Sequence, residues 1–281
     1  MTDKKILFEN YNSIAKLNNT LSTRKNNEVM KDEHSSSDEG YKEWYGTETY
    51  EEATSLLSFG WGDILDDITA AIEENKKLYY NLVDVKRMKT YNNVVGFTPN
   101  VPNAIQNLPK SMINIQHDTK KIKTVSIFYL NDGNCMVSAE DFVRSGGLLL
   151  AAIQLLEKNN VRVELNLCFQ TTIGQTEICI GSVKLKDFRQ PLSLKKICFP
   201  MAHPSMLRRI GFKFLETIPG LTDDSMVNGY GHAPTSTEEK EVADFIDKIF
   251  PKSNTILLSR RMIADDFDYD MEKLLNSFKL K

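Results

Sequence analysis

The residues best suited to catalysis in this chain are a cysteine and two histidines in its C-terminal half. A nucleophilic pair would form if the thiol of Cys198 contacted the imidazole of either His203 or His232. Such a pair requires a thiolate, whereas Cys198 lies between Ile197 and Phe199 in an apolar stretch that favours burial. We therefore predict that Cys198 is a buried and inert thiol, and we assign no catalytic residue.

Three other motifs match known ligand-binding patterns only in part. Asp266-x-Asp268-x-Asp270 begins like a calcium-binding loop, but the sixth position is Met271 rather than glycine. The same spacing would suit a nucleotidyltransferase, yet no Gly-Ser motif precedes it. Gly146-Gly147 lacks the third glycine of a dinucleotide-binding fingerprint. The aspartates are explained more simply as carboxylates at the start of a last helix. The two glycines are explained more simply by close packing of their helix.

A loop rich in glycine is the best candidate for contact with another molecule. In Gly229-Tyr230-Gly231-His232, the glycines allow close backbone approach, and Tyr230 is a residue type that often anchors interfaces. We predict an interaction loop that uses Tyr230 and His232 together with Asn134 of the 131–137 loop. The alternative is a plain flexible loop.

The composition is that of a globular protein, and its charge argues against nucleic-acid binding. Hydrophobic residues make up 41% of the 281 positions and charged residues 26%. The formal net charge is −3, whereas non-specific nucleic-acid binders carry a basic excess. The chain shows no secretory signal, no apolar run of about 20 residues and no C-x-x-C pair. We expect an intracellular protein that is neither secreted nor membrane-spanning.

A regular alternation of strands and helices begins near residue 119. Ile122 to Leu130 is apolar on both faces, as in an interior strand, and Ser138 to Lys158 predicts a helix buried on several sides. Gly146-Gly147 within that helix predicts close packing against the sheet. The other predicted elements are a hairpin of strands at 161–169 and 178–185 with a bulge at Gly181, helices at 204–217 and 236–250, a strand at 255–259 and a helix at 268–279.

Strands that are joined through helices return in the same direction, so this order predicts an α/β fold. We expect an α/β domain over 119–281, with a mostly parallel sheet, one antiparallel hairpin strand and helices on both faces. Residues 41–118 predict a helical and irregular region, in which Thr49-x-x-Glu52 opens a short helix that Gly60 ends.

The first 40 residues predict a separate segment. Ile6 to Leu17 follow helical spacing and predict a short docking helix. Residues 18–40 are polar and nearly free of large apolar groups, so burial cannot offset the entropy of ordering them. We predict a disordered linker over 18–40.

The order of elements resembles the von Willebrand factor A fold, a Rossmann-like sheet with one antiparallel strand after the second strand. Separately, several segments are similar to an uncharacterised family encoded by tailed bacteriophages and prophages, which implies a viral origin. The similar segments are residues 43–46, 51–53, 60–61, 96–112, 146–165, 203–209 and 229–231.

The von Willebrand resemblance implies a divalent cation such as Mg²⁺, held by an Asp-x-Ser-x-Ser loop, a threonine and an aspartate at the carboxyl ends of the strands. In this chain the first loop reads Asn131-Asp132-Gly133-Asn134-Cys135-Met136, so at least two ligand hydroxyls are missing. Turn chemistry of Asp, Asn and Gly is the alternative explanation of this loop. The residues that would fill the metal roles are Asp132, Thr222 or Asp223, and Asp265 or Asp266.

These observations lead to two functional hypotheses. The first is a phage-type protein that binds a phage or host protein, in the virion or in the host cytoplasm, and is not an enzyme. The alternative is a metal-dependent enzyme for nucleotide or phosphodiester substrates that uses the carboxylates at the strand ends. The sequence leaves the oligomeric state open.

Overall fold

The computed structural model describes residues 4–29, 33–36, 42–70, 73, 90–115, 123–133, 135–158, 161–173, 176–222, 235–250, 255–265 and 268–269. Its elements are, in chain order, β1 (Lys5–Tyr11), α1 (Ile14–Thr23), η1 (His34–Ser36), α2 (Lys42–Tyr45), α3 (Tyr50–Phe59), β2 (Thr90–Asn93), β3 (Thr98–Pro99), α5 (Val101–Ile105), β4 (Met112–Ile115), β5 (Thr124–Leu130), α6 (Ala139–Lys158), β6 (Arg162–Ile173), β7 (Glu177–Lys186), α7 (Leu194–Ala202), the π-helical turn η2 (Met206–Gly211), α8 (Phe212–Thr217), α9 (Ser236–Ile249), β8 (Thr255–Ser259), α10 (Arg260–Ile263), β9 (Ala264–Asp265) and β10 (Asp268–Tyr269).

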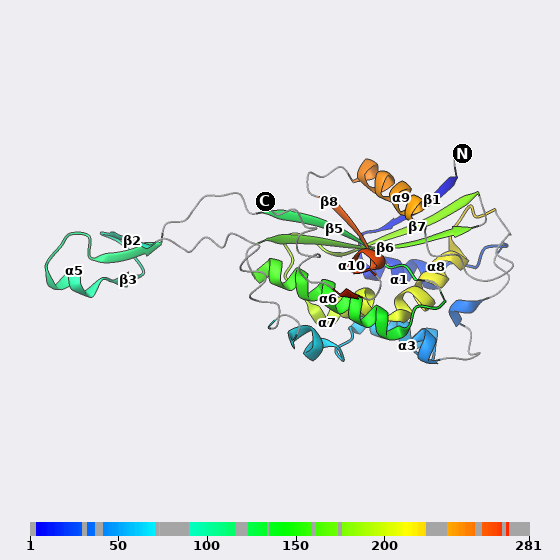
Figure 1. Cartoon of the computed structure of the whole chain (residues 1–281), viewed down its shortest axis with the longest axis horizontal. Helices are drawn as coiled ribbons and strands as arrows, with labels where there is room; N and C mark the ends of the chain where they lie inside the picture. The colour runs from blue at the N-terminus through cyan, green and yellow to red at the C-terminus, as the bar shows by residue number, and fades with distance from the viewer. Residues whose placement is uncertain are drawn as a thin grey trace.

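The centre of the fold is a five-stranded sheet in the order β1-β7-β6-β5-β8. The pairs β1/β7, β6/β5 and β5/β8 are parallel, and β6/β7 is an antiparallel hairpin. In Figure 1, α9 lies over one face of this sheet, and α1, α3, α6, α7 and α8 lie over the other. The predicted α/β class, with a mostly parallel sheet and helices on both faces, is confirmed.

Each face of the sheet has its own apolar core, because the strands carry apolar side chains on both sides. On β5, Val125, Ile127 and Tyr129 belong to the larger cluster, which α6 and α7 cover. Phe128 and Leu130 of the same strand belong to the smaller cluster, which α9 covers through Val242 and Ile246. β5 is therefore an interior strand, as its continuous apolar sequence predicts.

Helix α6 is buried in the larger core, as predicted, but its glycine contact differs from the prediction. A Cβ atom added at Gly146 would lie 2.3 Å from the carbonyl oxygen of Met201 in α7, so the close approach is to a helix rather than to the sheet. A Cβ atom added at Gly147 would meet Cγ1 of Ile68 at 3.9 Å, which is an ordinary contact. The side chains of α6 that are fully buried include Leu149, Ile153 and Leu156.

Three local features also differ from the sequence predictions. Gly181 is not a bulge, because the register irregularity of the hairpin falls between Leu165 and Asn166. A Cβ atom added at Gly181 would lie 2.9 Å from the side chain of Phe169. Helix α7, which contains Pro200, was not predicted. Asp268 begins the short strand β10, which pairs with β9, where a helix was predicted, and residues 270–281 lie outside the described part.

The N-terminal segment forms a strand where a docking helix was predicted. Lys5–Tyr11 pairs in parallel with β7, from Lys5 beside Glu177 to Tyr11 beside Val183. The helix begins only at Ile14, where the Ser13 hydroxyl accepts a hydrogen bond from the backbone of Lys16. The strand can lie between the two cores because Leu7 packs against the larger cluster, and its neighbours Ile6 and Phe8 pack against the smaller one.

Polar anchors hold the segment that was predicted to be a disordered linker. Helix α1 continues to Thr23, and the side chain of Asn27 donates a hydrogen bond to the carbonyl oxygen of Leu215 at 3.0 Å. The backbone and hydroxyl of Ser35 donate to the buried carboxylate of Glu216 at 2.8 and 2.6 Å. Disorder is therefore wrong for residues 18–29 and 33–36, and the rest of 18–40 lies outside the described residues.

The predicted boundaries near residues 40 and 118 do not separate folding units in the larger core. Leu17 of α1, Leu57 of α3 and Ile68 belong to the same buried cluster as Leu149 and Leu165. The predicted helix from Thr49 to Gly60 is confirmed, with Thr49 as its N-cap and Gly60 at φ +91° as its C-cap. Among the described helices, none is long and apolar enough to cross a membrane.

Residues 90–115 form a small unit of their own, which we call the apolar unit. Its three strands pair in the order β2-β4-β3, and α5 connects β3 to β4. Asn100 caps α5 through a hydrogen bond from the backbone of Asn103, and Pro102 occupies its first turn. Figure 1 shows this unit standing apart from the five-stranded sheet.

Candidate functional site

The predicted ligand Asp132 joins the ends of two strands. It follows β5 directly and is buried, with 2% of its surface exposed. Its Oδ1 accepts a hydrogen bond from the backbone N–H of Arg260 at 3.1 Å, and its carbonyl oxygen accepts one from Nε of Arg260 at 3.1 Å. Arg260 follows β8, which is parallel to β5, so the two residues meet at the same edge of the sheet. The carboxylate therefore binds the backbone at the start of α10, the Arg260 side chain binds the Asp132 carbonyl, and the two contacts link the ends of β5 and β8.

The predicted ligand Thr222 lies on the other side of the central strand β6. Its N–H and hydroxyl donate to the buried carboxylate of Glu177 at 3.0 and 2.8 Å. The same carboxylate accepts a hydrogen bond from Nζ of Lys5 at 2.7 Å. Glu177 begins β7, which is not adjacent to β5, so Thr222 and Asp132 are not brought together. Thr222 thus fastens the 218–222 segment to β1 and β7.

The remaining predicted site residues contribute no described side chain. Asp223, Asp266, Asn134, Tyr230 and His232 lie outside the described residues, and of Asp265 only its place in β9 is described. Within the ranges given above, no group of three or more His, Cys, Asp or Glu side chains is placed to hold a metal ion. The Mg²⁺ site that the von Willebrand resemblance implies stays a prediction, because the side chains of Asp223, Asp265 and Asp266 lie outside the described part.

Cys198 and His203 are both packed into the core. Cys198 is fully buried, as predicted, and burial raises the pKa of its thiol to about 12, which disfavours a thiolate at neutral pH. The His203 ring lies between Phe199 and Trp61, at centroid distances of 4.9 and 4.7 Å. Its Nδ1 accepts a hydrogen bond from the backbone of Ser205 at 3.2 Å. His203 is therefore a structural residue.

The burial of His203 predicts a loss of stability in acid. Burial lowers the pKa of His203 from 6.5 to about 4, so the folded state disfavours the proton that the unfolded chain binds below pH 6.5. The stability that comes from a neutral His203 is therefore fully present above pH 6.5 and is lost as the pH falls towards 4. At pH 5 this loss lowers the free energy of unfolding by about 2 kcal/mol. Urea unfolding of wild type and His203→Gln from pH 8 to pH 5 measures it. The variant should lose this part of the pH dependence, and parallel profiles would contradict the assignment.

Two consecutive buried arginines connect the sequence motifs 43–46 and 203–209. Arg209 donates to the carbonyl oxygens of Ser35 and Glu48 at 3.0 and 2.8 Å. Arg208 donates to the carbonyl oxygens of Trp44 and Val137, each at 2.5 Å, and its guanidinium stacks 4.1 Å from the Trp44 ring centre. Both side chains are at most 2% exposed, so the pair is buried and holds η2 against residues 35–48 and against Val137.

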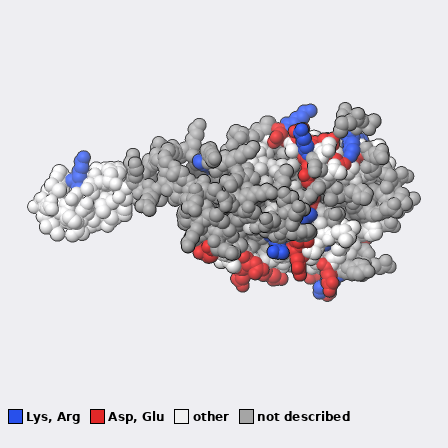
Figure 2. Space-filling model, viewed as in Figure 1, with Lys and Arg blue, Asp and Glu red and all other residues white. Residues whose placement is uncertain are grey.

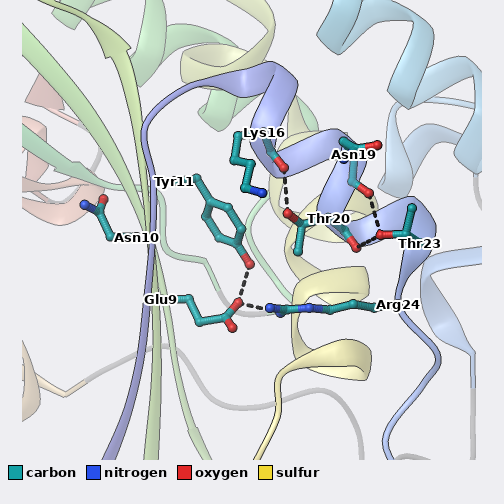
Figure 3. Close-up of a pocket in the computed structure, with 8 residues that line it drawn as sticks. All are labelled: Glu9, Asn10, Tyr11, Lys16, Asn19, Thr20, Thr23 and Arg24. Atoms are coloured by element: carbon teal, nitrogen blue, oxygen red, sulfur yellow. Dashed lines mark hydrogen bonds and ion pairs between the residues drawn. The ribbon is translucent and has the colours of Figure 1, made fainter.

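A polar pocket of about 400 Å³ lies between β1 and α1 (Figure 3). The Tyr11 hydroxyl donates to Glu9, and Nη1 of Arg24 donates to the same carboxylate at 2.6 Å. Burial raises the pKa of Tyr11, so its hydroxyl stays protonated at neutral pH. These three groups therefore bind one another and tie β1 to the end of α1. Its lining residues are Glu9, Asn10, Tyr11, Lys16, Asn19, Thr20, Thr23 and Arg24.

The most unusual surface of the described chain is the apolar unit. Lys110 is the single charged residue in 90–115, whereas the chain has 35 basic and 38 acidic residues in total. Figure 2 shows this unit as almost entirely uncharged. Large exposed apolar patches mark interaction sites, since isolated soluble proteins rarely leave them uncovered. Seven of the ten large hydrophobic side chains exposed among the described residues lie here: Tyr91, Val94, Val95, Phe97, Val101, Ile105 and Leu108.

Sequence reasoning missed this surface, although its signals were present. Pro99, Pro102 and Pro109 favour irregular backbone around the apolar residues from Val94 to Leu108, so the sequence predicts only an irregular stretch here. The absence of acidic residues over 26 consecutive positions in a chain that is 26% charged was the available signal.

Comparison with known proteins provides a family but no described activity. Neither the curated proteins nor the solved structures include a match to this chain. A family model described as a domain of unknown function, DUF7192, matches residues 1–276, and the chain therefore belongs to the DUF7192 family.

Proposed function

We propose that this chain is a protein-binding module and that the apolar unit is its contact surface. The observation that carries the proposal is the concentration of exposed apolar side chains in residues 90–115, with Ile105 at 76% exposure and Val95 at 72%. The larger unit, which is the five-stranded sheet with its covering helices, in contrast buries Arg208, Arg209, Cys168, Cys179, Cys198 and His203. No described residues favour the metal-dependent enzyme over this module.

The setting that we propose is a phage-encoded protein that acts in the virion or in the host cytoplasm. This part rests on the resemblance of the sequence segments to the phage and prophage family. The sheet order β7-β6-β5-β8, with an antiparallel strand after β6, supports the von Willebrand A-like part of the resemblance.

Site-specific photo-crosslinking tests the proposed surface. Phe97 lies in the apolar unit and is 63% exposed, and Phe59 at the end of α3 is 77% exposed, so the two make a matched pair. A photoreactive phenylalanine analogue at Phe97 should give discrete protein adducts in cells that make the chain. The analogue at Phe59 should not give them. The same adducts from both positions, or none from Phe97, would refute the proposal.

A further inference from the structure

The apolar unit has regular structure but no core of its own. It contains three strands of four, two and four residues and one short helix. None of the residues 90–115 is buried, and even the side chains of β4 are only partly covered. A small sheet is stable in water only when an apolar face is covered, and units below about 40 residues usually need an additional constraint.

The sequence of the unit excludes two of the usual constraints. Residues 90–115 contain no cysteine, so a disulfide cannot form within the unit. They contain no histidine, aspartate or glutamate either, so no typical side-chain ligand set for a structural metal is available. No described element outside the unit packs closely against β2, β3, β4 or α5. Since the described part of the chain leaves these side chains uncovered, we infer that they are covered by association with a second surface.

We propose that this second surface is the apolar unit of another copy of the same chain. The inference rests on the proposed function and names the partner. A matching surface must be apolar and nearly free of charge, and the unit itself has this character, with Lys110 as its one charged residue. Elsewhere, the described surface in Figure 2 carries both signs of charge. Two copies related by a two-fold axis would bring like surfaces together without repulsion between carboxylates.

The strand order of the unit supports pairing between copies. β4 is the middle strand, so β2 and β3 are edges, and β2 pairs with β4 on one side only. An exposed edge strand is a template for pairing with another chain. Antiparallel pairing of β2 with β2 of the second copy would join two small sheets into one and bury the exposed side chain of Tyr91 near the axis.

The molecular mass of the full chain in solution tests the inference. At about 50 µM, light scattering or sedimentation equilibrium should give twice the chain mass of 32.0 kDa. The double variant Phe97→Asp with Ile105→Asp should sediment as a monomer, with its dimer dissociation constant raised at least about a hundredfold. Phe59→Asp, which changes a more exposed phenylalanine outside the unit, should remain a dimer. Circular dichroism should show that the larger unit is folded in both variants.

The outcomes separate this inference from the proposed function. A monomeric wild type, or a dimer that persists in the double variant, overturns the pairing of two apolar units. If the photoreactive analogue at Phe97 then captures a different protein, the proposed function stands and only the identity of the partner is wrong. If it captures nothing, both fail. A dimer that the double variant abolishes, together with a Phe97 adduct of twice the chain mass, supports both.

Discussion

Removal of residues 1–36 is expected to unfold the larger unit. The deletion removes β1, whose seven residues pair with β7, and exposes the apolar side chains of β7 and α9 that it covers. It also removes Leu17 and Leu21, which are at most 1% exposed, and truncation of one such leucine typically costs about 2–5 kcal/mol. Glu216 would lose Ser35 and remain a buried carboxylate. The two leucines alone would cost about 4–10 kcal/mol, which together with the loss of β1 is comparable to the whole stability of a typical domain, about 5–15 kcal/mol.

Circular dichroism and thermal unfolding of the truncated chain measure this effect. A suitable control is the deletion of residues 90–115, closed by a short Gly-Ser linker, because none of those residues is buried. The control should retain the cooperative unfolding transition of the larger unit. Mild proteolysis gives a second readout, since residues 18–29 should be protected in the full chain. A folded fragment that starts near Gly40 would restore the interpretation of a disordered linker.

Elements with local and periodic signals could be predicted from the sequence, and those that depend on distant partners could not. The predicted helix over 236–250 matches α9, and its start is fixed locally, because the hydroxyl of Thr235 and the side chain of Glu238 satisfy each other's backbone N–H groups. The strand β1 was missed because its partner β7 lies 172 residues away in the sequence, and the spacing of Ile6 to Leu17 also fits a helix. Composition could not reveal that one serine, Ser35, anchors a polar segment to Glu216.

The candidate sites show the same limit. Asp132 was correctly placed beyond the end of β5, because that position follows from a local strand signal. Its contact with Arg260 depends on the pairing of β5 with β8 and could not be predicted locally. The apolar unit was missed for a different reason. Apolar residues predict burial on average, and only the structure shows that those from Tyr91 to Leu108 are left uncovered.

The same substitution at two consecutive glycines of α6 is expected to have opposite effects. Gly146→Ala places a Cβ atom 2.3 Å from the carbonyl oxygen of Met201 and 2.5 Å from Cα of Ala202. Both are backbone atoms of α7, so the helix must move and disturb Cys198 and its buried neighbours. We expect a cost of about 3 kcal/mol or more from this overpacking.

Gly147→Ala is the matched control, because the added Cβ meets only Cγ1 of Ile68 at 3.9 Å. Alanine is also a better helix former than glycine by about 1 kcal/mol, so this variant should gain stability. Urea unfolding of the two variants beside wild type measures both signs in one experiment. Equal effects at the two positions would show that α6 does not approach α7 through Gly146. In that case the contact between these helices, which covers one side of the larger core, would have to be formed by other residues.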